Sequence, residues 1–87
     1  MGSFNLKVVT PEGVLYEKPV KLLKVNTPLG YVVILPRHMS YITPVNEGFM
    51  DIQGEKEARV QYKVSKGLLY VEKTHTTLLL EAPAEKA

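Results

Sequence analysis

Glu57-Ala58-Arg59-Val60-Gln61-Tyr62-Lys63-Val64 is the stretch of this 87-residue chain that decides the fold class. Polar and apolar residues alternate through it, so one side of an extended strand carries Ala58, Val60, Tyr62 and Val64. Alternation with a period of two is typical of a strand that buries one face. A shift of one residue in the pairing would expose that whole face, so we expect the register of this strand to be well specified.

Similar short runs lie on both sides of this stretch, with turn residues between them. Residues 4–8 alternate in the same way, and the unbroken apolar run 31–35 predicts a central strand covered on both faces. Pro19 is expected to separate two strands. The strand at 41–45 also contains a proline, and because proline cannot donate a hydrogen bond to a β ladder, we expect this strand at a sheet edge. The adjacent leucines at 22–23 shift the apolar phase, which predicts a β-bulge.

The composition also favours strands. Val, Ile, Thr, Tyr and Phe make up 27 of the 87 residues, whereas Ala, the best helix former, numbers four. We therefore predict an all-β fold, an antiparallel two-sheet β-sandwich or flattened barrel of about nine to ten strands, over residues 1–82. At the end of the chain, residues 82–87 resemble the first turn of a helix. The predicted core includes Leu6, Val8, Val33, Leu35, Val60, Tyr62, Val64, Leu69 and Val71.

Charge and residue inventory exclude several classes of function. The net charge is +2 and the lysines are dispersed, so no basic cluster predicts a nucleic-acid partner. The chain has no Cys and only two His, and its six Gly are isolated, so we expect no catalytic residue, no metal site and no cofactor. The apolar runs are far shorter than the ~20 residues of a spanning helix, so we expect no direct insertion into a membrane.

One small all-β alternative is a carrier domain. Lipoyl and biotinyl domains present a single lysine at the tip of a tight hairpin, and Lys56 lies within such a hairpin signal at residues 54–57. The tripeptides that usually surround a carrier lysine, Asp-Lys-Ala or Met-Lys-Met, are absent. Modification of Lys56 therefore stays an alternative hypothesis to a protein-binding role.

Three segments, taken together, resemble the epsilon subunit of the rotary F-type ATP synthase. They are VVTPEGVLYE at residues 8–17, GYVVILPRH at 30–38 with Thr43 and Asn46-Glu47-Gly48 after it, and VSKGLLYV at 64–71 with TLLL at 77–80. Their order and spacing carry the resemblance, which spans roughly Phe4 to Ala84. The family has a β-sandwich followed by a helical hairpin, so residues 83–87 form a tail where the first helix of that hairpin would begin.

The resemblance implies a non-catalytic rotor subunit rather than an enzyme. Such a sandwich binds the gamma subunit and the c-subunit ring in the central stalk, and it helps to couple proton- or sodium-driven rotation to ATP synthesis. It implies a peripheral location on the cytoplasmic face of the bacterial inner membrane. In the family, nucleotide binding belongs to the helical hairpin, so no ATP binding is expected of the sandwich alone.

The resemblance also implies interface residues. The residues expected to face the c-ring are Tyr31, Arg37, His38 and Met39, and those expected to face gamma are Thr10, His38, Tyr41 and Thr43. In the family the middle motif usually reads Gly-Glu-x-Gly-Ile-Leu-Pro-Gly-His, and here Tyr31, Val33 and Arg37 occupy its Glu and two of its Gly positions. We expect the rigid loop at 36–41 to dock with Tyr31 on the ring and on the base of gamma.

Overall fold

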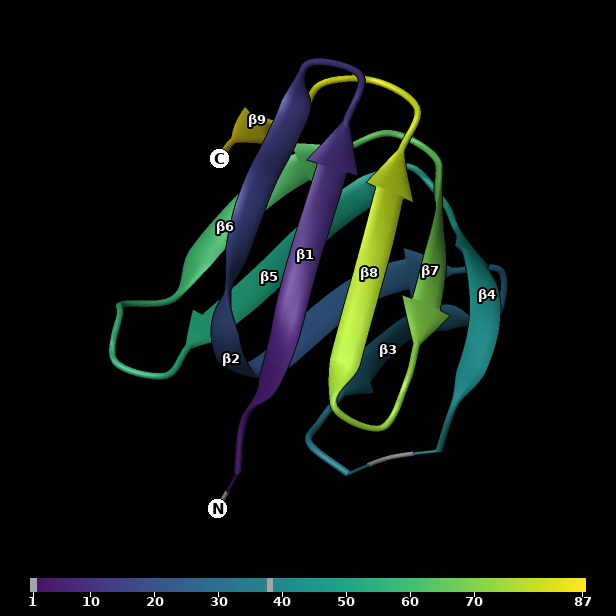
Figure 1. The fold of residues 1–87 in the computed structure, drawn as a ribbon. Helices are drawn as coiled ribbons and strands as arrows, with labels where there is room; N and C mark the ends of the chain where they lie inside the picture. Colours follow the sequence, from purple (N-terminus) through teal and green to yellow (C-terminus); the bar gives the residue numbers. More distant parts are fainter. Residues whose placement is uncertain (1, 38) are drawn as a thin grey trace.

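A computed structural model describes residues 2–37 and 39–87 of the chain, and these residues form nine strands and no helix (Figure 1). The strands are β1 (Phe4–Thr10), β2 (Gly13–Thr27), β3 (Gly30–Ile34), β4 (Tyr41–Val45), β5 (Gly48–Gly54), β6 (Val60–Val64), β7 (Gly67–Val71), β8 (His75–Leu80) and β9 (Glu85–Lys86). The predicted all-β class and the strand number are confirmed. His38 lies outside the described residues.

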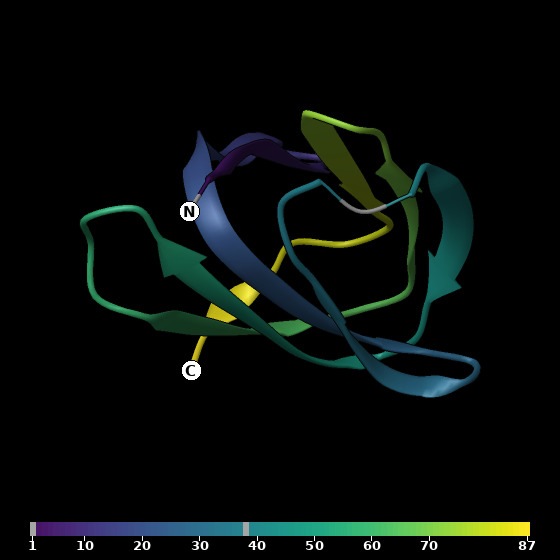
Figure 2. The ribbon, with the colours of Figure 1, turned by 90° about the horizontal axis from the view of Figure 1, so that it is seen from below.

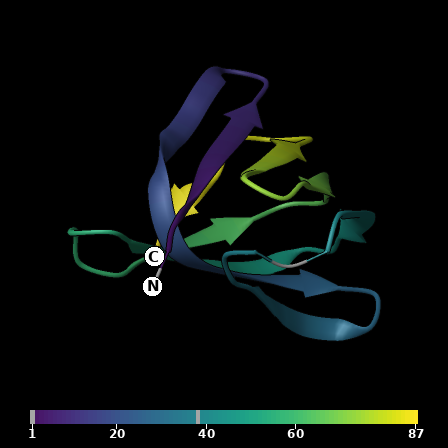
Figure 3. The same ribbon diagram turned by 60° about the horizontal axis from the view of Figure 1, so that its bottom comes forward.

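The strands form two facing layers that share β2 (Figures 2 and 3). The order along the sheet is β4-β7-β8-β1-β2-β5-β6-β9, with β3 paired to the second half of β2. The first half of β2 pairs with β1, and its pairing with β5 begins at Val20, where the register shifts before Leu22. The predicted bulge therefore lies where β2 bends from one layer into the other, because a bulge increases local bending and twist.

Two features of this topology differ from the predicted antiparallel arrangement. Pro19 does not separate two strands, because β2 is continuous and Pro19 is paired only on the β1 side, an edge position at which proline is tolerated. In addition, β1 and β8 pair in parallel, from Asn5 opposite His75 to Val9 opposite Leu79. All other pairings in the described chain are antiparallel.

The core lies between the two layers and consists mainly of aliphatic side chains. Of the predicted core, Leu6, Val8, Val64, Leu69 and Val71 are buried, and Val60 and Tyr62 pack partly buried against them. The prediction was wrong for Val33 and Leu35, which are 49% and 50% exposed. The predicted central strand covered on both faces is not what forms: within the described chain β3 pairs only with β2, and it turns Val32 and Ile34 to the core and leaves Val33 on the outer face. Leu35 follows the end of the strand.

The end of the chain also differs from the expected helical turn. Glu85 and Lys86 form β9, which pairs with Lys63 and Tyr62 of β6, and the N–H of Ala87 donates to the Gln61 carbonyl at 2.8 Å. The strand β6 itself begins at Val60, so Ala58 of the alternating stretch lies exposed before it. The backbone of β6 thus provides hydrogen-bond partners that a short isolated helical turn would lack. The described residues contain no helix long and apolar enough to span a bilayer.

Candidate protein-binding surfaces

The outer face of the layer formed by β4, β7, β8, β1 and the first half of β2 carries a continuous apolar row. Each member lies directly opposite the next in the strand register: Pro44, Leu68, Leu79, Val9 and Val14. We call these five residues the apolar stripe. Val14 is 53% exposed and Leu79 is 40% exposed. Contiguous exposed apolar surface of this kind marks sites of protein association.

A shallow hollow adjoins the apolar stripe at β4 and β7. Its volume is about 300 Å³, and Ile42, Tyr41 and Tyr70 contribute to its walls. Ile42 lies opposite Tyr70 in the register and is 64% exposed, which is high for a side chain of its size and apolarity. Partial burial raises the pKa of the Tyr41 phenol. The hollow therefore widens the apolar surface along β4 and β7.

The residues expected to face gamma lie beside the apolar stripe rather than in it. Thr10 is nearly buried; its Oγ1 donates to the Gly13 carbonyl at 3.2 Å and accepts from the Glu12 N–H at 3.1 Å, so it stabilises the β1–β2 turn. Thr43 is partly buried on β4, next to the Pro44 of the stripe. Tyr41 lines the hollow. The fourth expected residue, His38, lies outside the described residues.

Sequence reasoning missed the apolar stripe itself. Its signal was present in the doublet Leu68-Leu69 and the triplet Leu78-Leu79-Leu80, because consecutive apolar residues in a strand must put one of them on each face. In the structure Leu69, Leu78 and Leu80 point inward, and their neighbours Leu68 and Leu79 are left on the outer face.

The residues expected to face the c-ring are divided between two places. Tyr31 is the second residue of β3, whereas Arg37 and Met39 follow its other end, so more than half the strand, roughly 10 Å, separates them. Met39 is 84% exposed, and Arg37 has a backbone φ of 68°, in the left-handed region that favours glycine. Tyr31 lies near the β2–β3 turn, whose Leu29 is 95% exposed.

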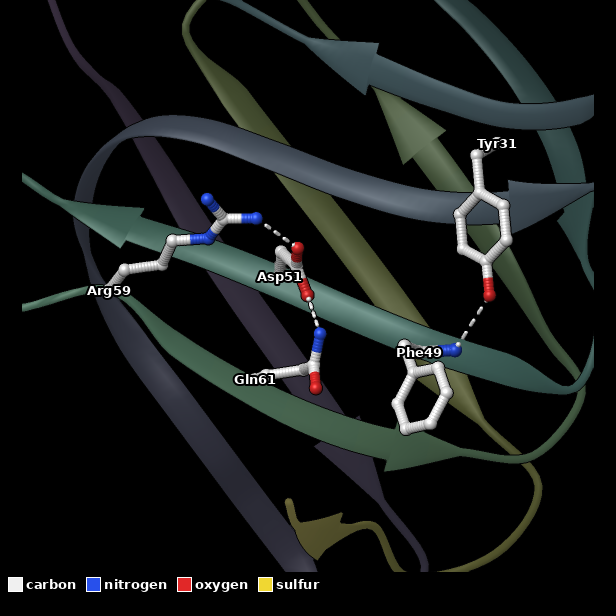
Figure 4. Close-up of polar contacts among 5 residues, drawn as sticks. All are labelled: Tyr31, Phe49, Asp51, Arg59 and Gln61. Atoms are coloured by element: carbon white, nitrogen blue, oxygen red, sulfur yellow. Dashed lines mark hydrogen bonds and ion pairs between the residues drawn. The ribbon is translucent and has the colours of Figure 1, made fainter.

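Tyr31 lies across the outer face of the second layer (Figure 4). Its Oη accepts a hydrogen bond of 3.1 Å from the backbone N–H of Phe49 on β5. The Lys24 ammonium lies 5.5 Å from the centre of the Tyr31 ring, within the range of a cation–π contact. The side chain therefore links three strands while remaining 48% exposed.

A buried carboxylate lies on the same outer face. The Asp51 side chain is 7% exposed, and it accepts one hydrogen bond from the Arg59 guanidinium and one of 2.8 Å from the Gln61 amide (Figure 4). The hydrogen bond from Arg59 is the main cause of a lowered pKa at Asp51; burial opposes it, and the Gln61 bond and the charges of Arg59 and Lys24 add to it. Nothing in the sequence pattern pointed to this cluster.

The described chain has no group of three or more His, Asp or Glu side chains that could hold a metal ion. Lys56, the alternative carrier lysine, lies exposed in the connection between β5 and β6. Its backbone N–H donates to the Glu57 carboxylate at 3.4 Å.

Solved structures with this fold include two from mitochondrial ATP synthases. A chain in the Euglena gracilis mitochondrial ATP synthase structure described as OSCP/F1/c-ring superimposes with a TM-score of 0.90 at 17% identity, covering 99% of this chain and 54% of that one. A chain in the Tetrahymena thermophila mitochondrial ATP synthase structure, described as central stalk/cring, gives a TM-score of 0.75 at 12% identity, covering 90% and 63%. At these identities the likeness shows the fold.

The sequence comparisons show the family. The ATP synthase epsilon chain of Halalkalibacterium halodurans is 35% identical over 83 residues, and that of Alkalihalophilus pseudofirmus is 34% identical over 83 residues. In both cases the match covers 94% of this chain and 61% of the relative, so the chain spans about three-fifths of the length of these relatives. A family profile described as the ATP synthase delta/epsilon chain, β-sandwich domain, matches residues 3–86. The chain therefore belongs to the family of ATP synthase delta/epsilon chain β-sandwich domains.

Proposed function

We propose that this chain acts as a non-catalytic part of the central stalk of a proton- or sodium-translocating F-type ATP synthase. Its relatives carry the name ATP synthase epsilon chain, and two proteins of the same fold come from structures that include a c-ring. In this role the sandwich binds the gamma subunit and the c-ring and helps to transmit ion-driven rotation to ATP synthesis. Family membership favours this role over a carrier domain modified on Lys56.

The observation that carries the proposal is the apolar stripe. Five directly paired apolar residues cross all five strands of one layer, and two of them are at least 40% exposed. Burial of apolar surface is the dominant favourable term in most protein association. We assign the gamma contact to the stripe and the adjoining hollow, with Tyr41 inside the contact and Thr10 and Thr43 supporting it from the neighbouring strand positions.

The c-ring contact is assigned to the Tyr31 end of β3. Tyr31 and the 95% exposed Leu29 offer an aromatic and an aliphatic side chain near the β2–β3 turn, and aromatic residues are enriched in interface centres. Arg37, His38 and Met39 follow the opposite end of β3. We therefore assign this loop to the base of gamma or its junction with the ring.

Membership of such a complex associates the chain with a membrane through its partners. We place it on the cytoplasmic face of a bacterial inner membrane, bound peripherally. The absence of ATP binding by the sandwich stays a prediction that follows from the family resemblance.

Co-purification tests the proposed function. The chain is mixed with tagged gamma subunit and, separately, with detergent-purified c-ring from the same organism, and with both together. The proposal predicts that gamma retains the chain in a defined complex and that the c-ring is recovered with it when gamma is present. Failure of purified, folded chain to associate with gamma in any of these mixtures would contradict it.

A further inference from the structure

The hollow between β4 and β7 has four corners on the outer face of the first layer (Figure 1). Ile42 lies opposite Tyr70 in the register, and the same register continued by two residues brings Ser40 opposite Glu72. Alternate residues of a strand point to the same face, so these four side chains surround one space. Val71, whose side chain is buried in the core, contributes to the floor between them.

The two ends of the hollow differ in chemistry. One end offers an aliphatic and an aromatic side chain, from Ile42 and Tyr70. The other end offers an exposed hydroxyl and an exposed carboxylate, from Ser40 and Glu72. Neighbouring side chains on one face of a strand lie roughly 7 Å apart. The hollow is therefore apolar at one end and acidic at the other, over a length that one long side chain can span.

The carboxylate of Glu72 is available to a cation from a partner. Glu72 is the only charged residue that lines the hollow within the part of the chain that the structure describes. Lys73 follows it, and His75 lies opposite on β8, where its carbonyl accepts the Glu72 N–H at 2.8 Å. Lys73 offsets the charge of Glu72 in the overall balance, but among residues 2–37 and 39–87 neither Lys73 nor His75 forms an ion pair with it. The His75 Nδ1 is hydrogen-bonded to the Thr74 hydroxyl at 2.8 Å.

A guanidinium group fits these four corners better than an ammonium group does. It is planar, so it can stack on the Tyr70 ring, and its parallel N–H donors match a carboxylate such as that of Glu72. The aliphatic stem of an arginine can cover Ile42, and the Ser40 hydroxyl offers a further acceptor. Arginine is also among the residue types that most often dominate the energy of an interface.

We propose that the hollow receives an arginine side chain of the gamma subunit, with the guanidinium paired to Glu72 and the stem over Ile42 and Tyr70. This inference rests on the proposed function, which assigns the adjoining apolar stripe to gamma. The hollow is continuous with the stripe, because Ile42 and Pro44 are alternate residues on the same face of β4. The site does not involve β3, to which the c-ring contact is assigned.

An apolar side chain is the main alternative occupant. Ile42 and Tyr70 alone would accept a leucine or a phenylalanine side chain. The Glu72 carboxylate would then lose water without gaining a partner, which costs free energy. Glu72 is exposed, so part of its hydration would remain and this cost would be reduced. An apolar occupant is therefore an outcome that the test has to distinguish.

The first probe is N-acetyl-arginine methylamide, titrated into the isotope-labelled chain and followed by amide chemical shifts. The matched probe is its citrulline counterpart, which has nearly the same shape without the charge. We expect shifts centred on residues 40–42 and 70–72, and affinity about two- to fivefold higher for the arginine probe. E72Q should abolish this preference, whereas E85Q, on β9 of the other layer, should retain it. Y70A should weaken binding of the arginine probe, and Y70F, which keeps the ring, should not.

The second readout is isothermal titration calorimetry with purified gamma subunit. E72Q should weaken gamma binding about three- to tenfold at low salt and less at about 0.5 M salt, because an exposed charge pair is screened. E85Q should stay within about twofold of wild type. Gamma binding by the wild type without any preference for the arginine probe would overturn this inference alone. Absence of gamma binding by the wild type would overturn the proposed function and, with it, the partner named here.

Three further results would overturn the inference. Equal affinities for the arginine and citrulline probes would remove the role of charge. Tighter binding of N-acetyl-leucine methylamide than of the arginine probe, at the same residues, would assign the hollow to an apolar side chain. Equal gamma binding by wild type and E72Q at low salt would leave Glu72 outside the contact.

Discussion

The hydroxyl of Tyr31 on β3 accepts the backbone N–H of Phe49 on β5 at 3.1 Å, and so links two strands that both neighbour β2. The backbone pairing between β2 and β5 ends at Lys24 opposite Asp51. Beyond that point the Phe49 N–H is bonded by the Tyr31 side chain instead of by the β2 backbone. A Cβ on Gly48 would come within 2.8 Å of the same hydroxyl, which shows how closely Tyr31 approaches the β5 backbone. Tyr31 therefore has a structural role in addition to its exposed surface.

Tyr31→Phe should lower the free energy of unfolding by about 0.5–1 kcal/mol, because it removes one hydrogen bond from a site that water can still reach. Urea denaturation followed by circular dichroism measures the difference. The control is Tyr70→Phe, since the Tyr70 hydroxyl makes no hydrogen bond among the described residues, and it should change stability by less than about 0.5 kcal/mol. A loss in the control equal to that in Tyr31→Phe would contradict the structural role of the Tyr31 hydroxyl.

Thr76→Val should stabilise the sandwich. Thr76 is 1% exposed between Leu6 and Val71, and its Oγ1 has no hydrogen-bond partner within the described chain. Replacing a buried, unpaired hydroxyl by a methyl group of similar volume removes a desolvation penalty of about 1 kcal/mol or more. Thermal unfolding should show a higher midpoint for this variant, while Thr77→Val on the outer face should change little. A clear drop in the midpoint of Thr76→Val would mean that the hydroxyl is hydrogen-bonded after all.

Arg59→Ala should lower the free energy of unfolding at pH 7 by about 1–3 kcal/mol, because it leaves the buried Asp51 carboxylate without its main partner. The loss is smaller than for a fully buried pair because the Arg59 side chain is 61% exposed and screened by solvent. The folded-state pKa of Asp51 lies below its ordinary value of 3.8, so its stabilising contribution is complete above that value and is lost as the pH falls through the folded pKa. The difference between wild type and variant should therefore shrink in denaturant titrations below about pH 4. A difference in unfolding free energy between wild type and Arg59→Ala that grows as the pH falls would contradict the stabilising role of the ionised Asp51.

Arg37→Gly should raise stability by about 0.5–1 kcal/mol, because Arg37 has a φ of 68° and a non-glycine residue in that region is strained. The gain is reduced by the greater freedom of glycine in the unfolded chain. Arg37 is exposed, so no core contact is lost. Differential scanning calorimetry should give a higher midpoint than for Arg37→Ala, which keeps the strain.

The sequence pattern predicted the faces of strands where it alternates and failed where it does not. Val60, Tyr62 and Val64 turn inward as predicted because polar residues separate them. The apolar run 31–35 contains no such marker, so its inward residues could not be identified from the run alone. In the structure Val32 and Ile34 face the core and Val33 lies exposed on the outer face of the same layer, because only one face of β3 packs against the core.

The pairing of strands that are distant in the sequence could not be predicted from the local pattern either. The parallel contact of β1 with β8 joins residues about 70 positions apart, and local alternation carries no record of such a partner. The apolar stripe depends on that pairing, since Val9 meets Leu79 only because β1 and β8 are neighbours. The family resemblance named Thr10 and Thr43, each of which is one residue away from a member of the apolar stripe. The stripe residues themselves could be identified only from the strand register of the structure.

Binding of purified gamma subunit to two matched variants tests the central claim most directly. Val14→Glu places a charge in the apolar stripe and Val33→Glu places the same charge on the opposite layer; the two valines are 53% and 49% exposed, so neither change should unfold the domain. By isothermal titration calorimetry, Val14→Glu should weaken gamma binding at least about tenfold, while Val33→Glu should leave it within about twofold of wild type. Equal affinities for both variants, or a loss confined to Val33→Glu, would contradict the assignment of the apolar stripe to gamma.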